Sequence, residues 1–142
     1  LSLHDALPIS YASAAWACSA NVSTIIRCDT EDYDPNNNYS TVTYKYTAPI
    51  SGYYLICGRC KGSNLGANVR IFTQIVVNSV TKSSGADVQA TGTGSYVASQ
   101  ISDVLYAVAG QLMWVEVNIT AAANTQRDDA TSIWQSFQFV GQ

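Results

Sequence analysis

Four stretches of the chain alternate polar and apolar residues with a period of two, and this pattern constrains the fold more than any other sequence feature. The stretches are TVTYKYT (41–47), NVRIFTQIVV (68–77), QLMWVEVNI (111–119) and SIWQSFQFV (132–140). Successive side chains of a β-strand point to opposite faces, so a half-buried strand shows this alternation. We therefore predict four strands. Three of them carry these residues on one face: Val42, Tyr44 and Tyr46; Val69, Ile71, Ile75 and Val77; Met113, Val115, Val117 and Ile119.

Segments rich in Gly, Pro, Asn and Ser separate these stretches and predict turns. They are DPNNN (34–38), APISG (48–52), KGSNLGAN (61–68), KSSGAD (82–87) and TGTGS (91–95). No segment shows the 3.6-residue repeat of an amphipathic helix. The Ala-rich segment 10–20 lacks a helix cap, which favours a linker followed by a first strand. Many short strands separated by turns indicate an all-β sandwich or barrel, and 142 residues are enough for one domain.

The chain is poor in charge, and this limits the classes of partner. Charged residues make up 12% of the sequence, against about 25% in a typical domain. The net charge of −3 and the scattered Lys and Arg residues exclude the basic face of a nucleic-acid-binding protein. No apolar run approaches the roughly 20 residues of a membrane span, so we expect no integral membrane segment. Such a composition suits secreted proteins, virion proteins and stable oligomers.

The stretch YKYTAPISGYYLI (44–56) carries the best resemblance to a known family. Its order of Tyr46, Ala48-Pro49, Gly52 and Tyr54 resembles the C1q-type globular head, which shares its jelly roll with the tumour necrosis factor family. Four further segments resemble that family in the same order: AWACSA (15–20), TIIRCDTEDYDP (24–35), SDVLYAVAGQLMWVEV (102–117) and WQSFQF (134–139). The departures are Tyr44 where Gly is common, Gln111 after Gly110 in place of Asp, and Ser136 in place of the closing Gly.

The resemblance implies a jelly-roll β-sandwich of C1q/TNF-like type that assembles as a homotrimer. Aromatic residues would then lie either in the monomer core or at the trimer axis, and the candidates are Tyr46, Tyr54, Trp114 and Phe137. Loops at the apex would bind a ligand, with Asn64, Asn68, Arg127 and Asp128 as polar contacts.

The function implied is a non-enzymatic recognition head at the tip of a fibre or stalk. It would be extracellular, on a secreted protein or a virion surface, and would bind a cell-surface glycan or protein. The alternative is a structural trimerisation domain or capsid-type jelly roll that binds no external ligand.

The first ten residues contain the only histidine, His4. LSLHDALPI (1–9) is identical to the translation of a common short-read sequencing adapter, CTT TCC CTA CAC GAC GCT CTT CCG ATC. This resemblance implies an assembled environmental read, and we expect residues 1–10 to be an adapter-like artefact or a disordered segment. The predicted domain is 11–142.

Without His4 the chain has no histidine for Ser-His-Asp or Cys-His catalysis, and we expect no enzyme. The enzymatic alternative would need the carboxylates of Asp128 and Asp129 to form a close pair with those of the acidic segment.

The acidic segment CDTEDYDPNNN (28–38) is the candidate metal site. Asp32, Asp34 and Asn36 have the first three spacings of an EF-hand calcium loop. Asn37 replaces the Gly of position six, and Thr43 replaces the Glu of position twelve. The segment therefore predicts either a turn between two strands or a calcium site. No other cofactor is expected.

The four cysteines, at positions 18, 28, 57 and 60, are expected to be structural. The CGRC motif (57–60) follows the strand-like YYLI without a helix signal, although a redox CxxC motif requires a helix start to lower its thiol pKa. Cys18 and Cys28 are not spaced as a second zinc-binding pair. Disulfides are permitted, but the pairing stays open.

Overall fold

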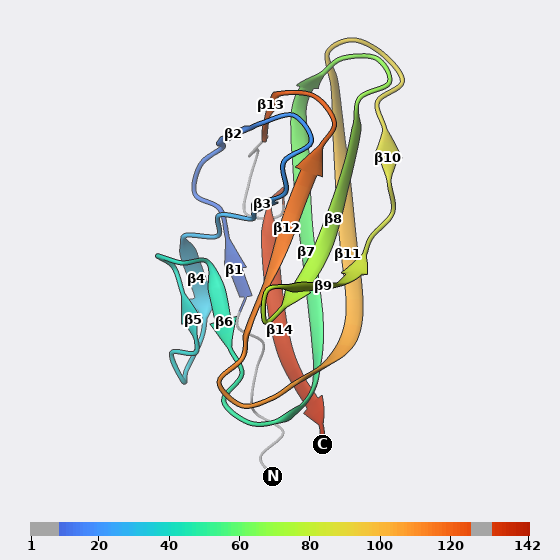
Figure 1. The fold of residues 1–142 in the computed structure, drawn as a ribbon. Coiled ribbons are helices and arrows are strands. Elements are labelled where there is room, and N and C mark those ends of the chain that lie inside the picture. The colour runs from blue at the N-terminus through green and yellow to red at the C-terminus, as the bar shows by residue number, and fades with distance from the viewer. Residues whose placement is uncertain (1–8, 126–131) are drawn as a thin grey trace.

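The computed structural model describes residues 9–125 and 132–142, and this part of the chain folds into two antiparallel β-sheets packed face to face (Figure 1). The all-β jelly-roll sandwich predicted from the sequence is confirmed. Its strands are β1 (Ile9–Tyr11), β2 (Ala17–Cys18), β3 (Thr24–Ile25), β4 (Thr30–Tyr33), β5 (Tyr39–Ser40), β6 (Lys45–Thr47), β7 (Gly52–Leu65), β8 (Arg70–Val77), β9 (Val80–Ser84), β10 (Val88–Gln89), β11 (Ser95–Ala107), β12 (Leu112–Ile119), β13 (Ala123–Thr125) and β14 (Trp134–Gly141).

The first sheet, called sheet A below, has the order β2-β13-β7-β14-β1-β4, and β11 pairs with the other edge of β7. The second, sheet B, has the order β10-β8-β12-β6-β5, with β3 added to β12 and β9 to β8. The loops that join β7 to β8 and β10 to β11 lie at one end of the sandwich, and the C-terminus lies at the other (Figure 1). We call the end with these loops the apex and the opposite end the base.

The predicted alternation explains the core. All four residues predicted on one face of β12, from Met113 to Ile119, are fully buried. Ile71 and Ile75 of β8 are equally buried beside them, and Tyr54 and Ile56 of β7 close the core from sheet A. From Gly52 to Gly62 the even-numbered residues of β7 therefore face sheet B, and the odd-numbered residues face away from the sandwich.

A buried amide links the two sheets. Gln135 of β14 is fully buried, and its Oε1 accepts a hydrogen bond from the backbone N–H of Val115 at 3.1 Å. Its Nε2 donates to the hydroxyl of Tyr39 at 2.7 Å and to the carbonyl of Tyr44 at 3.2 Å. The Tyr39 hydroxyl in turn donates to the carbonyl of Cys28 at 2.8 Å. The amide therefore satisfies groups of sheet B that strand pairing leaves open.

The strand predicted over 41–47 is wrong for its first four residues. Residues 41–44 form the turn between β5 and β6, and only Lys45–Thr47 are in a strand. The turn closes when the Tyr44 N–H donates to the Ser40 carbonyl at 2.7 Å, with Tyr44 at φ 60°. Tyr44 stands where the resembled family commonly has Gly, and the left-handed backbone explains that preference.

The turn predicted over 61–68 begins too early, because β7 continues to Leu65. Pairing with β11 on one edge and β13 on the other holds this segment extended despite its Gly and Asn residues. Gly62 fits because it has no side chain: a Cβ there would lie 3.1 Å from Leu65. At the other end of the chain, β1 begins at Ile9, two residues before the predicted domain boundary.

Candidate functional site

The outward face of sheet A carries a cluster of exposed aromatic and aliphatic side chains near the base. Tyr53 of β7 pairs with Tyr106 of β11, and their rings meet edge to face with centroids 5.3 Å apart. Leu55 pairs with Val104 on the same face one step along. Tyr53 is 47% exposed, Tyr106 51% and Val104 48%. We call these four residues the tyrosine patch.

The tyrosine patch extends to an edge of the sheet. Strand β11 is thirteen residues long, and among the described strands it pairs only with β7. Its other edge pairs with no described strand, and at Val104 the backbone N–H donates instead to the Asp103 carboxylate at 2.8 Å. A long, flat, partly apolar edge is a surface that a protein must cover or protect.

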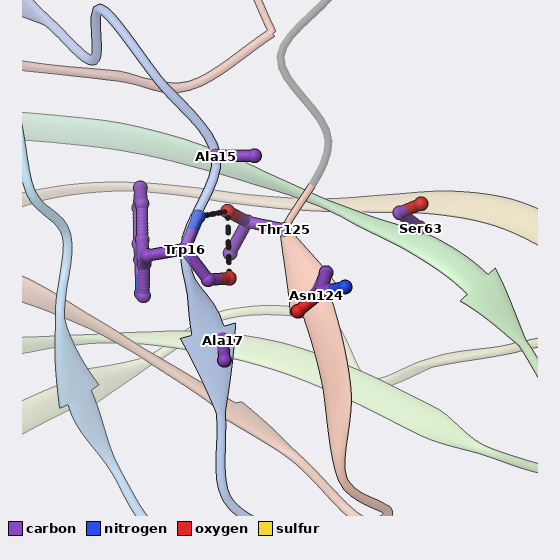
Figure 2. A pocket seen from close by; sticks show the side chains of 6 residues that line it. All are labelled: Ala15, Trp16, Ala17, Ser63, Asn124 and Thr125. Carbon is purple, nitrogen blue, oxygen red and sulfur yellow. Dashed lines mark hydrogen bonds between the residues drawn. The ribbon is translucent and has the colours of Figure 1, made fainter.

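A polar pocket lies near the apex of the same sheet. It has a volume of about 350 Å³ and is lined by Ala15, Trp16, Ala17, Ser63, Asn124 and Thr125 (Figure 2). Strands β2, β13 and β7 meet there, and Asn124 pairs with Ala17 on one side and with Ser63 on the other. Residues directly opposite in antiparallel strands point to the same face. Ala17, Asn124 and Ser63 therefore form one row across three strands.

Hydrogen bonds fix the wall of this pocket. The Thr125 hydroxyl accepts from the Trp16 N–H at 2.9 Å and donates to the Trp16 carbonyl at 3.2 Å (Figure 2). Trp16 is 8% exposed and its indole projects away from Ser63 (Figure 2), toward the Arg27 guanidinium 5.9 Å from the ring centroid. The backbone of Trp16 therefore lines the pocket, and the face of its indole ring does not.

A β-bulge lies beside the row. Leu65 pairs with Ser95 and Gly62 with Val97, so Ser63 and Asn64 of β7 together oppose Tyr96 of β11. Asn64 takes up the extra residue in the left-handed region at φ 54°. Bulges bend a strand and redirect its side chains, and they occur often beside binding sites.

The predicted ligand contacts lie around this apical end. Asn64 is exposed next to the last residue of β7, and Asn68 is exposed in the loop to β8. The Asn68 side-chain oxygen accepts from the Gln89 amide at 3.1 Å, and its backbone N–H donates to the Ala90 carbonyl at 2.9 Å. Arg127 and Asp128 lie outside the described residues, as does Asp129 of the enzymatic alternative.

The acidic segment contains β4 and the turn that follows it. Asp34 accepts a hydrogen bond from the Tyr39 N–H at 2.6 Å, and its carbonyl accepts from the Asn37 N–H at 3.2 Å. In the part of the chain that the structure describes, no group of three or more acidic, His or Cys side chains is placed to hold a metal ion. Calcium binding by Asp32, Asp34 and Asn36 stays a prediction.

All four cysteines are free thiols, and three of them are buried. Burial raises the pKa of Cys28 to about 12 and raises the pKa of Cys60 well above its ordinary value. Cys57 and Cys60 are three residues apart in β7, so their side chains lie on opposite faces of the sheet. The CGRC motif is therefore not arranged as a redox pair.

The four aromatic candidates for the core or the trimer axis are all buried within the single chain. Tyr46 stacks on Phe137 with centroids 5.0 Å apart, and it meets Tyr54 edge to face at 6.1 Å. Trp114 faces outward from sheet B but is 6% exposed, since the Lys45 ammonium lies 4.1 Å from its ring centroid. Their burial places these side chains in the packing of the single chain, and a role at a trimer axis stays a prediction.

Sequence reasoning missed Tyr53, Tyr106, Ser63 and Asn124. The first two could have been found from the alternation itself, because a core position for Tyr54 places its neighbour Tyr53 on the opposite face. Ser63 and Asn124 could not, because only the register of β13 against β7 brings them together.

Comparison with known proteins bears on the fold. No family model matches the chain, and no curated protein matches its sequence. The structure is similar to the globular domain of zebrafish complement 1qA protein, with a TM-score of 0.67 and 13% identity over 96% of this chain and 98% of that chain. It is similar to Eiger TNF from S. frugiperda with a TM-score of 0.67 and 10% identity over 96% of this chain and 92% of that one.

No helix among the described residues is long and apolar enough to cross a membrane. The strand order, the aromatic core and the near-complete overlap with both solved structures agree with the resemblance found in the sequence. The chain is a jelly-roll domain of the C1q/TNF-like fold.

Proposed function

We propose that this chain is a non-enzymatic recognition head that assembles as a homotrimer and binds a cell-surface glycan or protein. The head would stand at the tip of a fibre or stalk outside the cell, on a secreted protein or on a phage or bacterial fibre. The fold supports the general class, since both similar structures are of C1q and TNF domains.

The tyrosine patch is the observation that carries the proposal. Two tyrosines about half exposed, in ring contact beside a free strand edge, form a surface that is costly to leave in water. Two further copies of this chain are the occupants we propose. A chain with 12% charged residues suits that role, because stable oligomer interfaces are poor in charge and rich in aromatic residues.

The described part of the chain supports a role other than catalysis. Burial raises the pKa of the Cys18, Cys28 and Cys60 thiols, which keeps them protonated and unreactive. The Asp29 carboxylate accepts hydrogen bonds from Ser13. A nucleophile needs an activating base, and these groups are engaged in structural contacts.

Light scattering on the purified protein tests the assembly. We expect three times the mass of one chain for the wild type. The double variant Tyr53→Ser/Tyr106→Ser should be a folded monomer, because each trimer loses six aromatic anchors. Val80→Ser is the matched control: Val80 is 52% exposed on β9 of sheet B, and its loss should leave the trimer intact. A monomeric wild type would overturn the proposal.

The same measurement with and without EDTA tests the calcium prediction. Loss of the trimer on chelation, with recovery on added Ca²⁺, would support a metal site at Asp32, Asp34 and Asn36. A trimer unaffected by EDTA that also shows no heat of Ca²⁺ binding would contradict it.

Recognition is tested by binding of the labelled trimer to a printed glycan array and to cells treated with periodate or protease. Periodate cleaves vicinal diols of sugars, so its effect identifies a glycan, and loss after protease identifies a protein. A trimer that binds neither the array nor cells would favour the second candidate function, a structural trimerisation or capsid-type jelly roll.

A further inference from the structure

We propose that the apical pocket between β2, β13 and β7 binds a single neutral sugar ring at the end of a glycan. The inference deepens the proposed recognition function and rests on it. It assigns the ligand class and the contacting residues, and neither Asn64 nor Asn68, the described loop residues predicted from sequence, is among the lining residues.

The pocket exists because the row across the three strands consists of small side chains. Ala17, Asn124 and Ser63 are neighbours by register, and Ala15 continues the surface beyond β2. Alternation sends the larger neighbours, Trp16 and Cys18, to the buried side of the sheet. The outward surface of sheet A is therefore hollowed at this row, while the larger side chains stay packed on the buried side of the sheet.

The two polar side chains of the row are available to a ligand. Among the described residues, neither the Asn124 amide nor the Ser63 hydroxyl makes a side-chain hydrogen bond, whereas the Thr125 hydroxyl is committed to Trp16. An amide offers a carbonyl acceptor and two N–H donors, and a hydroxyl offers both functions. This set matches adjacent sugar hydroxyls, each of which is also a donor and an acceptor.

An exposed aromatic residue lies on β11 across the β-bulge from Ser63. Tyr96 opposes the bulge formed by Ser63 and Asn64, and it is 59% exposed. The Lys61 ammonium lies 5.6 Å from the centroid of its ring, which places the ring on the outward face of sheet A. A sugar ring has polar edges and an apolar C–H face, so it can bond the amide and hydroxyl while its face packs on the tyrosine.

The size and charge of the pocket restrict the ligand. A volume of about 350 Å³ lies at the small end of ligand sites, which suits one ring and not a nucleotide or an oligosaccharide. None of the six lining residues is charged, and the Lys61 ammonium, two residues along β7 from Ser63, lies over the Tyr96 ring, so the lining itself gives a phosphate or carboxylate no counter-charge. A peptide adding as a strand is disfavoured, because β2 offers an edge of only two residues.

Saturation-transfer NMR and isothermal titration with methyl glycosides test the site. The probes are the methyl α-glycosides of glucose, galactose, mannose, N-acetylglucosamine and N-acetylgalactosamine. We expect at least one to bind with a dissociation constant on the order of 1 mM, which three copies would strengthen on a cell surface. The double variant Asn124→Ala/Ser63→Ala should weaken that binding about tenfold or more, because two ligand hydrogen bonds are lost.

The control is Gln100→Ala, an exposed polar residue on the same outward face of sheet A, nearer the base. The affinity of Gln100→Ala for the glycoside should equal that of the wild type. All variants are checked for an unchanged unfolding midpoint. Equal binding by Asn124→Ala/Ser63→Ala and the wild type would overturn the site, and so would the absence of binding by every glycoside.

The failure of this site can be told apart from the failure of the proposed function. All six lining residues come from one chain, so the binding readout does not depend on trimer formation. A trimer that binds cells but no glycoside would overturn the sugar site alone. A monomer that binds a glycoside would retain the site and overturn the trimeric head.

Discussion

Replacing Gln135 by methionine isolates what one buried amide contributes to the stability of the sandwich. The two side chains are similar in length and volume, so the substitution removes hydrogen bonds with little change in packing. The amide bonds a backbone N–H, a backbone carbonyl and a hydroxyl, all three on the facing sheet or its turn. No described strand pairs with these groups in place of the Gln135 amide.

The structure explains why the bonds to Gln135 have no substitute. On the edge opposite β8, β12 pairs with β6 at Leu112–Met113 and with β3 at Glu116–Val117, so Val115 lies in the gap between the two short strands. Methionine leaves the Val115 N–H and the Tyr44 carbonyl without partners. A buried unsatisfied N–H such as that of Val115 costs about 1–3 kcal/mol, and the Tyr44 carbonyl adds less because its site is only partly buried, so the free energy of unfolding should fall by about 1–3 kcal/mol. Tyr39 keeps its bond to Cys28 and adds little.

Urea unfolding followed by tryptophan fluorescence measures the effect, at one fixed protein concentration because assembly shifts the midpoint. Gln138→Met on the same strand is the control, since Gln138 is half buried on the outward face and should change stability by less than about 0.5 kcal/mol. A loss below about 1 kcal/mol for Gln135→Met would refute the reasoning, because water or rearranged backbone would then be satisfying both groups.

Three further predictions follow from local contacts. Burial alone would raise the pKa of Asp29, but hydrogen bonds from the Ser13 hydroxyl and N–H outweigh it and lower the pKa. The stabilisation is therefore present above the unfolded pKa and is lost at lower pH, so the stability gap between wild type and Ser13→Ala should narrow below about pH 4 in urea titrations. A gap independent of pH would contradict this. Cys57, the one cysteine that is not buried, should be alkylated first by iodoacetamide, and the other three should be modified only after unfolding. Mass spectrometry of peptides measures the order of modification. Modification of Cys28 or Cys60 before Cys57 would contradict their burial. Gly58→Ala should lower the free energy of unfolding by about 1–3 kcal/mol, because the added Cβ would lie 2.9 Å from both Val115 methyl groups. If this contact is the cause, adding Val115→Ala to the variant should restore part of the loss.

The sequence predicted the fold where burial and local pattern agree. β12 and β8 were found from alternation because one face of each is buried along its whole length. The pattern failed at 41–44, where Thr, Val and Tyr continue the alternation of a strand through a turn, and Val42 is 83% exposed. It failed again at 61–65, where Gly and Asn signal a turn but pairing on both edges of β7 keeps the chain extended. Tertiary pairing overrides local propensity in both cases.

The candidate site was less predictable than the fold for a physical reason. Binding surfaces here depend on register between strands that are distant in sequence, and one residue of slip would move Ser63 and Asn124 to opposite faces. Asn64 was predicted as a contact in an apical loop, yet its position is set by a β-bulge at the end of β7 that no sequence pattern predicted. The aromatic excess was noticed, but alternation alone divides it between the core around Tyr54 and the outward patch around Tyr53.

Tyr44 allows the cost of one backbone conformation to be measured directly. Its φ of 60° is in the left-handed region, where a residue with a Cβ is strained by about 1–2 kcal/mol and glycine is not. A comparison of Tyr44→Gly with wild type would mix this gain with loss of the half-buried ring. The pair Tyr44→Gly and Tyr44→Ala avoids the problem, because both lack the ring and both keep the carbonyl that Gln135 bonds.

In this pair, the entropy of the unfolded chain favours alanine by about 0.5–1 kcal/mol, and the folded backbone favours glycine by about 1–2 kcal/mol. Tyr44→Gly should therefore be more stable than Tyr44→Ala by up to about 1.5 kcal/mol in urea unfolding. If alanine were the more stable of the two, the turn could not hold a left-handed residue at this position. The Gly preference of the resembled family would then need a cause other than backbone strain.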